Sequence, residues 1–150
     1  CLGIDVQRPG DGRRLPPWVA RDGRNVRAIC RDAVEVLEHA LPAASLDEVL
    51  LLFPDPWHKK RHHKRRIVQA PFIALVAKVL TPGGLFRLAT DWEPYAEEML
   101  ARLNAAPAFG NLAPDGGYAP RDESRTATRF ERRGQRLGHG VWDLSFRRTP

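Results

Sequence analysis

Four aspartates directly follow short apolar runs that have the composition of buried strands. They are Asp5, Asp32, Asp55 and Asp91. The runs alternate with helical patterns, which predicts an α/β fold with a parallel sheet and helices on its faces. Because the carboxyl ends of parallel strands meet at the edge where ligands bind, we expect the four carboxylates to gather there. Each also has a plainer interpretation, since Asp32 and Asp91 could cap helices and Asp5 could belong to a turn.

Asp55 has the most restrained surroundings of the four. It follows the apolar run 49–53 and stands between Pro54 and Pro56. Each proline fixes its own φ and pushes the preceding residue out of the helical region. Trp57 follows, either as a core residue or as a platform on which a base could stack. The pattern predicts a rigid corner that holds a carboxylate at the end of a buried strand.

A dense cationic cluster begins two residues after Trp57. In residues 59–66 six of eight are Lys or Arg, and the other two are His62 and His63. Such a run is either a solvated face or a nucleic-acid patch, and the absence of interleaved acids favours the patch. The whole chain has 24 Lys and Arg against 18 Asp and Glu, a formal charge of +6. An acid beside this cluster indicates a site that binds an anionic polymer and acts on it.

The histidines raise the alternative of a metal site. His58 and His62 are four residues apart, but no cysteine accompanies them and the surrounding cations repel a metal ion. We therefore favour base contact or solvation and expect no metal. Asp55 with Lys59 or Lys60 also fits a metal-dependent nuclease, except that His58 stands where that site needs a second acid.

Length and composition predict one globular domain. The chain has 150 residues, of which 43% are hydrophobic, enough for a core. Cys1 and Cys30 form no disulfide framework, which indicates a reducing compartment. Because no window approaches the ~18 apolar residues of a membrane span and no signal peptide is visible, we expect a cytoplasmic protein. The chain begins inside an apolar run without Met, so we interpret it as a fragment.

The helices and strands that must position these residues are predicted from the periodicity of the hydrophobic residues and from the positions of Pro and Gly. Strands are expected at 2–6, 26–30, 49–53 and 85–89, and helices at 13–22, 33–40, 71–80 and 92–103. Residues 81–84 should form a turn, and Thr90 with Glu93 has the spacing of a capping box. Residues 105–126 are expected to be a long loop. Two strands at 128–133 and 141–147 would then close the fold as an antiparallel hairpin.

A longer stretch around Asp55 resembles a known family signature. Residues Phe53-Pro54-Asp55-Pro56-Trp57-His58-Lys59-Lys60-Arg61-His62-His63-Lys64-Arg65-Arg66 closely resemble the motif of bacterial tRNA (guanine-N7-)-methyltransferases. Matching pieces follow in order over nearly the whole chain, among them Gly3-Ile4-Asp5-Val6, Ala89-Thr90-Asp91-Trp92-Glu93, Thr128-Arg129-Phe130-Glu131 and Gly138-His139-Gly140-Val141-Trp142.

The resemblance implies a Rossmann-like methyltransferase, mostly parallel with a reversed last strand. Its cofactor would be S-adenosylmethionine, its partner tRNA, and its product 7-methylguanosine from a guanine of the variable loop. The first strand and the Gly-rich loop would precede Cys1. Residues 1–150 would therefore form a single but incomplete methyltransferase domain, which we expect to be inactive alone.

The resemblance also assigns roles by matching position. Asp55 would be catalytic, and Asp5, Asp32 and Asp55 would bind the cofactor. Substrate contacts would come from Lys59, Asp91, Thr128, Arg129, Phe130 and Glu131. The RNA backbone would be held by Arg61, His62, His63, Lys64, Arg65 and Arg66.

Some residues depart from the family pattern and some questions stay open. Asp5 stands where the family usually has Glu, Arg129 where Lys is common, and Pro16 with Pro17 where its helix is uninterrupted. A non-enzymatic RNA-binding module, or a methyltransferase acting on another RNA base, remains an alternative. The sequence does not distinguish a monomer from a homodimer.

Overall fold

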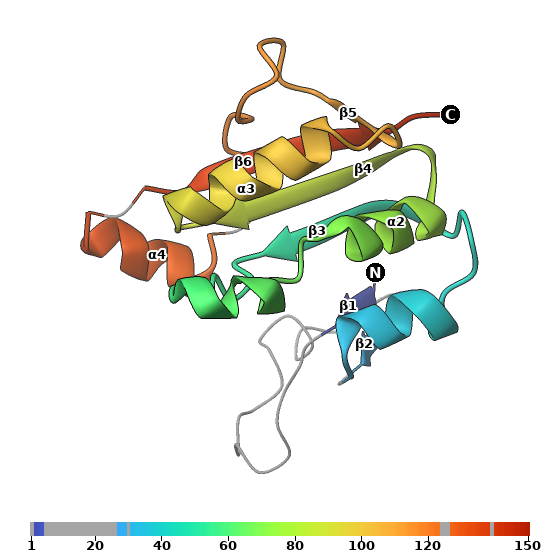
Figure 1. Cartoon of the computed structure of the whole chain (residues 1–150), viewed down its shortest axis with the longest axis horizontal. Coiled ribbons are helices and arrows are strands. Elements are labelled where there is room, and N and C mark those ends of the chain that lie inside the picture. Colours follow the sequence, from blue (N-terminus) through green and yellow to red (C-terminus); the bar gives the residue numbers. More distant parts are fainter. Residues whose placement is uncertain (1, 5–26, 30, 124–126, 139) are drawn as a thin grey trace. The chain divides into compact units, whose positions relative to one another are not determined.

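The computed structural model describes residues 2–4, 27–29, 31–123, 127–138 and 140–150 (Figure 1). Asp5 and the helix expected at 13–22 lie outside the described residues. The chain divides into two compact units, Cys1–Leu41 and Pro42–Pro150. Among the described helices, none is long and apolar enough to cross a membrane.

The first unit contains two parallel strands and a helical segment. Strand β1 (Leu2–Ile4) pairs with β2 (Arg27–Ile29), which confirms the described parts of the two predicted strands. Helix α1 (Ala33–Glu35) continues into the π-helical turn η1 (Val36–Ala40). Asp32 is the N-cap, and its Oδ1 accepts hydrogen bonds from the backbone N–H of Val34 at 2.8 Å and of Glu35 at 3.3 Å. This confirms the predicted cap.

The second unit is built on a four-stranded mixed sheet in the order β3-β4-β6-β5. Strand β3 (Leu46–Leu52) runs parallel to β4 (Leu80–Thr90). Strand β6 (Trp142–Arg148) is antiparallel to β4 on one side and to β5 (Phe109–Asn111) on the other. The α/β class and the reversed last strand are thus confirmed.

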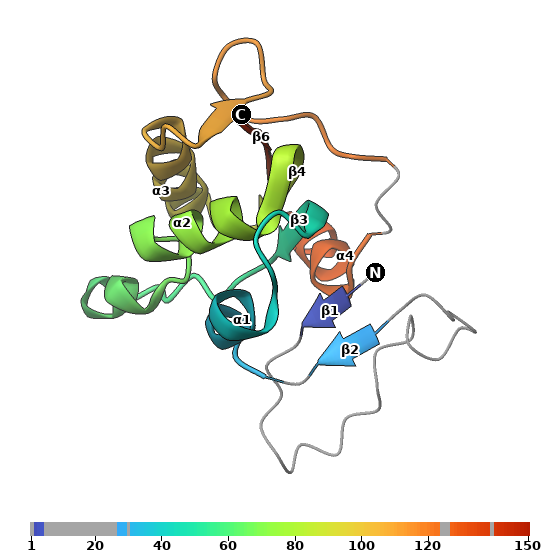
Figure 2. The same cartoon turned by 90° about the vertical axis from the view of Figure 1, so that its right-hand side faces the viewer.

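Two amphipathic helices cover one face of this sheet (Figure 2). They are α2 (Ala70–Val79), with Pro71 in its first turn, and α3 (Glu93–Asn104). Phe72, Val76 and Val79 are buried, as their spacing predicts. The ring of Phe86 lies 6.4 Å from that of Phe72 and 5.7 Å from that of Phe109, centroid to centroid. This core fixes the sheet edge at which β3 and β4 end.

The predicted terminal hairpin is wrong in its first strand. Residues 129–136 form helix α4 (Arg129–Arg136), and the antiparallel neighbours of β6 are β4 and β5. Strand β5 lies within the stretch 105–126 that was expected to be a loop. The helix forms although Thr128 and Phe130 favour strands, because Thr128 and Glu131 cap its start with reciprocal hydrogen bonds.

The predicted capping box at Thr90 and Glu93 is also wrong. Thr90 is the last residue of β4, where it pairs with Trp142, and the N-cap of α3 is Trp92. The Thr90 hydroxyl instead accepts a hydrogen bond from the Trp92 N–H at 3.3 Å. The strand pairing keeps Thr90 extended, so the helix starts later, with Pro94 in its first turn.

The turn expected at 81–84 lies inside β4 as an irregularity. Leu46 of β3 pairs with Leu80 and Glu48 pairs with Leu85, so the register shifts across these residues. Gly83 has a φ of +80°, which glycine adopts without strain. Strand β4 therefore begins earlier than predicted, and the residues of the expected turn form a bulge within it.

Candidate active site

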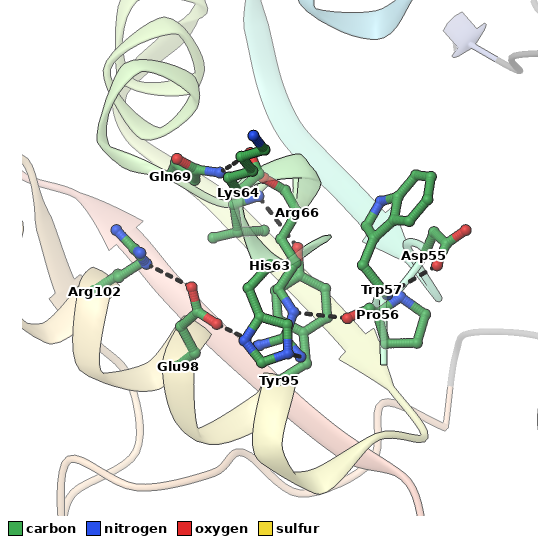
Figure 3. Close-up of polar contacts among 11 residues, drawn as sticks. Asp55, Pro56, Trp57, His63, Lys64, Arg66, Gln69, Tyr95, Glu98 and Arg102 are labelled. Carbon is green, nitrogen blue, oxygen red and sulfur yellow. Dashed lines mark hydrogen bonds and ion pairs between the residues drawn. The ribbon is translucent and has the colours of Figure 1, made fainter. Parts of the chain in front are cut away.

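Asp55 lies on a sharp corner at the carboxyl end of β3. The backbone N–H of Phe53 donates to the carbonyl of Ala89 at 2.8 Å, which extends the pairing with β4 by one residue. Oδ1 of Asp55 then accepts a hydrogen bond from the Trp57 N–H at 2.9 Å. Asp55 is exposed, and its second oxygen points away from the chain (Figure 3). The corner thus presents one fixed carboxylate oxygen outward.

The backbone on both sides of Asp55 is strained. Phe53 has a φ of +51° and Trp57 a φ of +46°, a region that bulky residues rarely adopt. We expected Phe53 to be extended because it precedes a proline. Such conformations persist only where surrounding contacts enforce them, and they concentrate at functional sites. Here the ladder bond of Phe53 constrains one end of the corner.

Arg66 constrains the other end. Its guanidinium is buried, with 2% of the side chain exposed, and Nε donates to the Pro56 carbonyl at 2.6 Å. One terminal nitrogen donates to the carboxylate of Glu98 on α3, and the other lies 3.1 Å from His63 Nε2. The guanidinium carbon also stands 4.7 Å from the centre of the Tyr95 ring. Figure 3 shows these contacts converging on Arg66.

The expected contact of Arg66 with the RNA backbone is therefore corrected. Its donors point into the protein and tie the Pro56 carbonyl to α3. Glu98 is further held by Arg102 at 3.0 Å, and the Tyr95 hydroxyl accepts from the Val68 N–H at 3.2 Å. Burial raises the pKa of Tyr95. Arg66 is thus the internal anchor of the corner.

The other cations of the cluster stay at the surface. Residues Lys60–Arg65 form the 3-10 helix η2, and the exposed side chains are those of Lys59, Lys60, Arg61, Lys64 and Arg65. His62 and His63 are half-buried. The guanidinium of Arg65 lies 5.0 Å from the centre of the Trp57 ring, and the His62 ring meets Trp57 edge-on at 5.9 Å. Trp57 is therefore packed within the cluster.

A pocket of about 340 Å³ opens where β4 ends. Asp91 lines it together with Trp92, Glu93, Pro94, Leu137, Gly138, Gly140 and Trp142. The His58 ring lies 4.3 Å from that of Trp92, so the corner after β3 contacts the junction after β4. Asp55 and Asp91 thus follow adjacent parallel strands, as predicted. The sequence analysis gave Trp142 no role in the site, although it belongs to the strand predicted at 141–147 and to one of the stretches that match the family.

A larger cavity, about 470 Å³, lies elsewhere on the sheet. Its lining includes Leu50, Leu52 and Arg87, and Arg87 forms ion pairs with Glu48 and Asp122. It contains none of the residues that the sequence assigned to catalysis or binding. The smaller pocket beside Asp91 is therefore the better candidate for a substrate site.

Thr128 and Glu131 form reciprocal hydrogen bonds at the start of α4. The Glu131 N–H donates to the Thr128 hydroxyl at 3.1 Å, and the Glu131 carboxylate accepts from the Thr128 N–H at 3.3 Å. Glu131 is fully buried and also accepts from Arg121 Nε at 2.8 Å, which raises the pKa of Arg121. This reciprocal capping box accounts structurally for two residues assigned to substrate. The side chains of Arg129 and Phe130 lie outside the described residues.

The remaining assignments belong to the first unit. Asp32 caps α1 in Cys1–Leu41, whereas Asp55 and Asp91 belong to Pro42–Pro150. The meeting of all four carboxylates at one edge stays a prediction. Within the described part of the chain, His, Cys, Asp and Glu form no group of three or more that could hold a metal ion.

Comparisons with known proteins agree with the signature. Residues 1–144 match the Methyltransf_4 family model, described as "Putative methyltransferase". The chain is 56% identical over 148 residues to the tRNA (guanine-N(7)-)-methyltransferase of Pseudomonas putida strain W619, covering 99% of this chain and 62% of the relative. It is 58% identical over 147 residues to the enzyme of that name from Ectopseudomonas mendocina, covering 98% of this chain and 62% of the relative.

Two solved structures show the same fold at low identity. The Burkholderia thailandensis 1,6-didemethyltoxoflavin-N1-methyltransferase, solved with S-adenosylhomocysteine, has a TM-score of 0.54 at 15% identity, covering 99% of this chain and 61% of that one. The protein PH0851 has a TM-score of 0.64 at 19% identity, and the match covers 97% of this chain and 36% of that one. The chain spans 62% of the length of the curated relatives named above. The match over residues 1–144 nevertheless settles the family, and the chain belongs to the Methyltransf_4 methyltransferases.

Proposed function

We propose that the full-length protein transfers a methyl group from S-adenosylmethionine to N7 of a guanine in tRNA, in the cytoplasm. The observation that carries this proposal is the restrained Asp55 corner, which lies between the pocket of about 340 Å³ at Asp91, contacted through His58 and Trp92, and an exposed cationic helix. Relatives at 56% and 58% identity that carry the name of this activity support it.

Two carboxylates, one in each compact unit, have the chemistry that the cofactor needs. Asp32 and Asp55 are exposed carboxylates that are each fixed through Oδ1 by backbone N–H groups. A fixed carboxylate suits a ligand that carries hydroxyl groups and an ammonium group, because it only accepts hydrogen bonds. S-adenosylmethionine supplies the electrophilic methyl group on its sulfonium. Asp32 would hold the cofactor at its adenosine end, and Asp55 would stand where cofactor and guanine meet.

Asp55 would act by charge and position. Guanine N7 has a free lone pair, so the attack requires no general base. Positive charge develops on the purine as the methyl group is transferred. A preorganised carboxylate stabilises that charge without reorganisation, and the Asx turn with Trp57 fixes it in place. Asp91, with Trp92 and Trp142, would orient the base in the pocket.

The test is nucleoside mass mapping of tRNA treated with the full-length protein. The wild-type protein should give 7-methylguanosine, and Asp55→Ala should lower kcat at least about 100-fold with less than threefold change in tRNA affinity. A methylated nucleoside of another type would contradict the N7 assignment. A protein that binds tRNA without S-adenosylmethionine-dependent transfer would be a binding module.

Asp115 provides a matched control for this variant. It is exposed, and its Oδ1 accepts a hydrogen bond from the Gly117 N–H at 2.9 Å, the same contact to the residue two positions on that Asp55 makes. Because Asp115 does not line the Asp91 pocket, Asp115→Ala should leave kcat within twofold of the wild-type value. Equal losses in the two variants would mean that the effect of Asp55→Ala comes from loop stability.

A further inference from the structure

Helix α4 carries a row of arginines along one face. Its arginines stand at positions 129, 132, 133 and 136, and we call these four the α4 arginine row. This is the i, i+3, i+4, i+7 spacing of a single helix face, about 10 Å from end to end. The side chains of Arg132, Arg133 and Arg136 are exposed. Of these four arginines, only Arg129 is given a role by the family resemblance.

The positive charge of this face is not neutralised by α4 itself. Glu131 is the one acid in the sequence of α4, and it is buried within the capping box and paired with Arg121. Among the residues that the structure describes, Arg132, Arg133 and Arg136 have no carboxylate within ion-pair distance. A helix of two turns therefore offers several outward guanidinium groups with no acidic neighbour on the same face.

The row adjoins the candidate substrate pocket. Leu137 and Gly138, directly after α4, line the pocket together with Asp91 and Trp142. Helix α4 and the segment 60–66 both lie at the edge to which the arrows of β3 and β4 point (Figure 1). Figure 2 places them on opposite sides of these two strands. A polyanion with one unit in the pocket would have cationic surface on both sides of it.

We propose that the α4 arginine row is a second contact surface for the RNA backbone, in addition to η2. The inference rests on the proposed function, in which the bound polymer is tRNA. Guanidinium groups bind phosphate oxygens in a planar, bidentate manner, and the row offers at least three exposed ones. RNA fits better than an acidic protein because the row borders a cavity that is lined by two tryptophans, which suit a base.

The test compares tRNA binding by variants of the full-length protein as salt is varied. Arg133→Gln with Arg136→Gln should weaken binding at least about tenfold near ~0.1 M salt, and should reduce the slope of log affinity against log salt by about 1.4. The control is Lys78→Gln with Arg147→Gln, which removes the same charge from exposed positions on α2 and β6. The control should stay within threefold of wild type. Unchanged affinity and slope in the α4 variant would overturn the proposal.

Further variants separate charge from structure and RNA from protein. The variant Arg133→Lys with Arg136→Lys should retain most of the slope of log tRNA affinity against log salt, because attraction to phosphate requires the positive charge. If this variant lost as much tRNA affinity as the Gln variant, a contact with the RNA backbone would be contradicted. If the Gln variant lost affinity for poly-glutamate but not for tRNA, the surface would serve an acidic protein and the proposal would fail. If tRNA binding behaves as expected while methyl transfer is absent, the row stands and the proposed enzymatic function fails.

Discussion

At the scale of single residues, one cation in the cluster 59–66 has a different role from the others. Arg66 is buried and hydrogen-bonded to Pro56 and Glu98, whereas Lys64 and Arg65 beside it are exposed. It acts on the carboxylate of Asp55 only through the backbone of the corner, so it is a positioning residue. Removing one partner of a buried ion pair is costly because the other charge is left uncompensated.

We predict that Arg66→Gln lowers the free energy of unfolding by about 3 kcal/mol and reduces kcat more than it changes KM. Arg102→Gln is the matched control, because Arg102 pairs with the same Glu98 but is 41% exposed. It should cost less than about 1 kcal/mol. Arg66→Lys keeps the positive charge but lacks the planar guanidinium that donates in several directions. Relative to Arg66→Gln, it should therefore restore stability more fully than kcat. Urea unfolding and steady-state kinetics of the full-length protein measure these effects, and similar losses for Arg66→Gln and Arg102→Gln would contradict the anchor role.

At the scale of elements, the pattern Thr-x-x-Glu occurs twice with different outcomes. At Thr128 and Glu131 it forms a capping box, whereas at Thr90 and Glu93 it does not, because Thr90 belongs to the β4–β6 ladder. Helix η2 likewise owes its surface position to its neighbours. Arg66 is buried in an ion pair with Glu98, whereas the residues of η2 that precede it keep their positive side chains at the surface.

The exposed cations of η2 should set the salt dependence of tRNA binding. Changing Arg61, Lys64 and Arg65 together to Gln should make the slope of log affinity against log salt shallower by about 2, since each lost phosphate contact contributes about 0.7. Binding isotherms at several salt concentrations measure the slope. Arg66 is omitted from this variant because its side chain is buried. An unaltered slope would exclude η2 as the main phosphate-binding surface.

At the scale of the whole molecule, the two compact units contain different parts of the expected chemistry. The cofactor candidate Asp32 belongs to Cys1–Leu41, and Asp55, Asp91 and η2 belong to Pro42–Pro150. Within the described residues, β3 has a strand partner on one side, which is β4. An edge strand leaves one row of its backbone N–H and C=O groups without a strand partner.

We predict that a polypeptide of residues 1–150 alone gives no measurable methyl transfer, whereas a chain of the length of its relatives does. The physical reason is that the chain covers 62% of those relatives, and a cofactor pocket at a sheet edge needs contributions from several strands. Radiolabel transfer from S-adenosylmethionine to tRNA, compared at equal protein concentration, tests this. Equal rates for the two polypeptides would contradict it.

The sequence alone determined the features that depend on neighbouring residues. The amphipathic helices α2 and α3, the cap at Asp32 and the family signature could be predicted, because periodicity and helix-breaking residues act over a few positions. The strand before Asp55 is present as predicted, but its predicted burial is wrong, because no residue of β3 is buried and Leu50 is 51% exposed. The two prolines correctly placed a restrained corner, although the positive φ of Phe53 was not foreseen.

Only the tertiary structure decided which charges are buried and which strands pair. Arg66 and Glu98 are 32 residues apart in sequence, and no local pattern distinguishes Arg66 from Arg65. The same holds for β6, which lies between β5, the strand before it in sequence, and the more distant β4. Burial and pairing depend on which remote groups satisfy a charge or a backbone hydrogen bond, and local sequence does not contain that information.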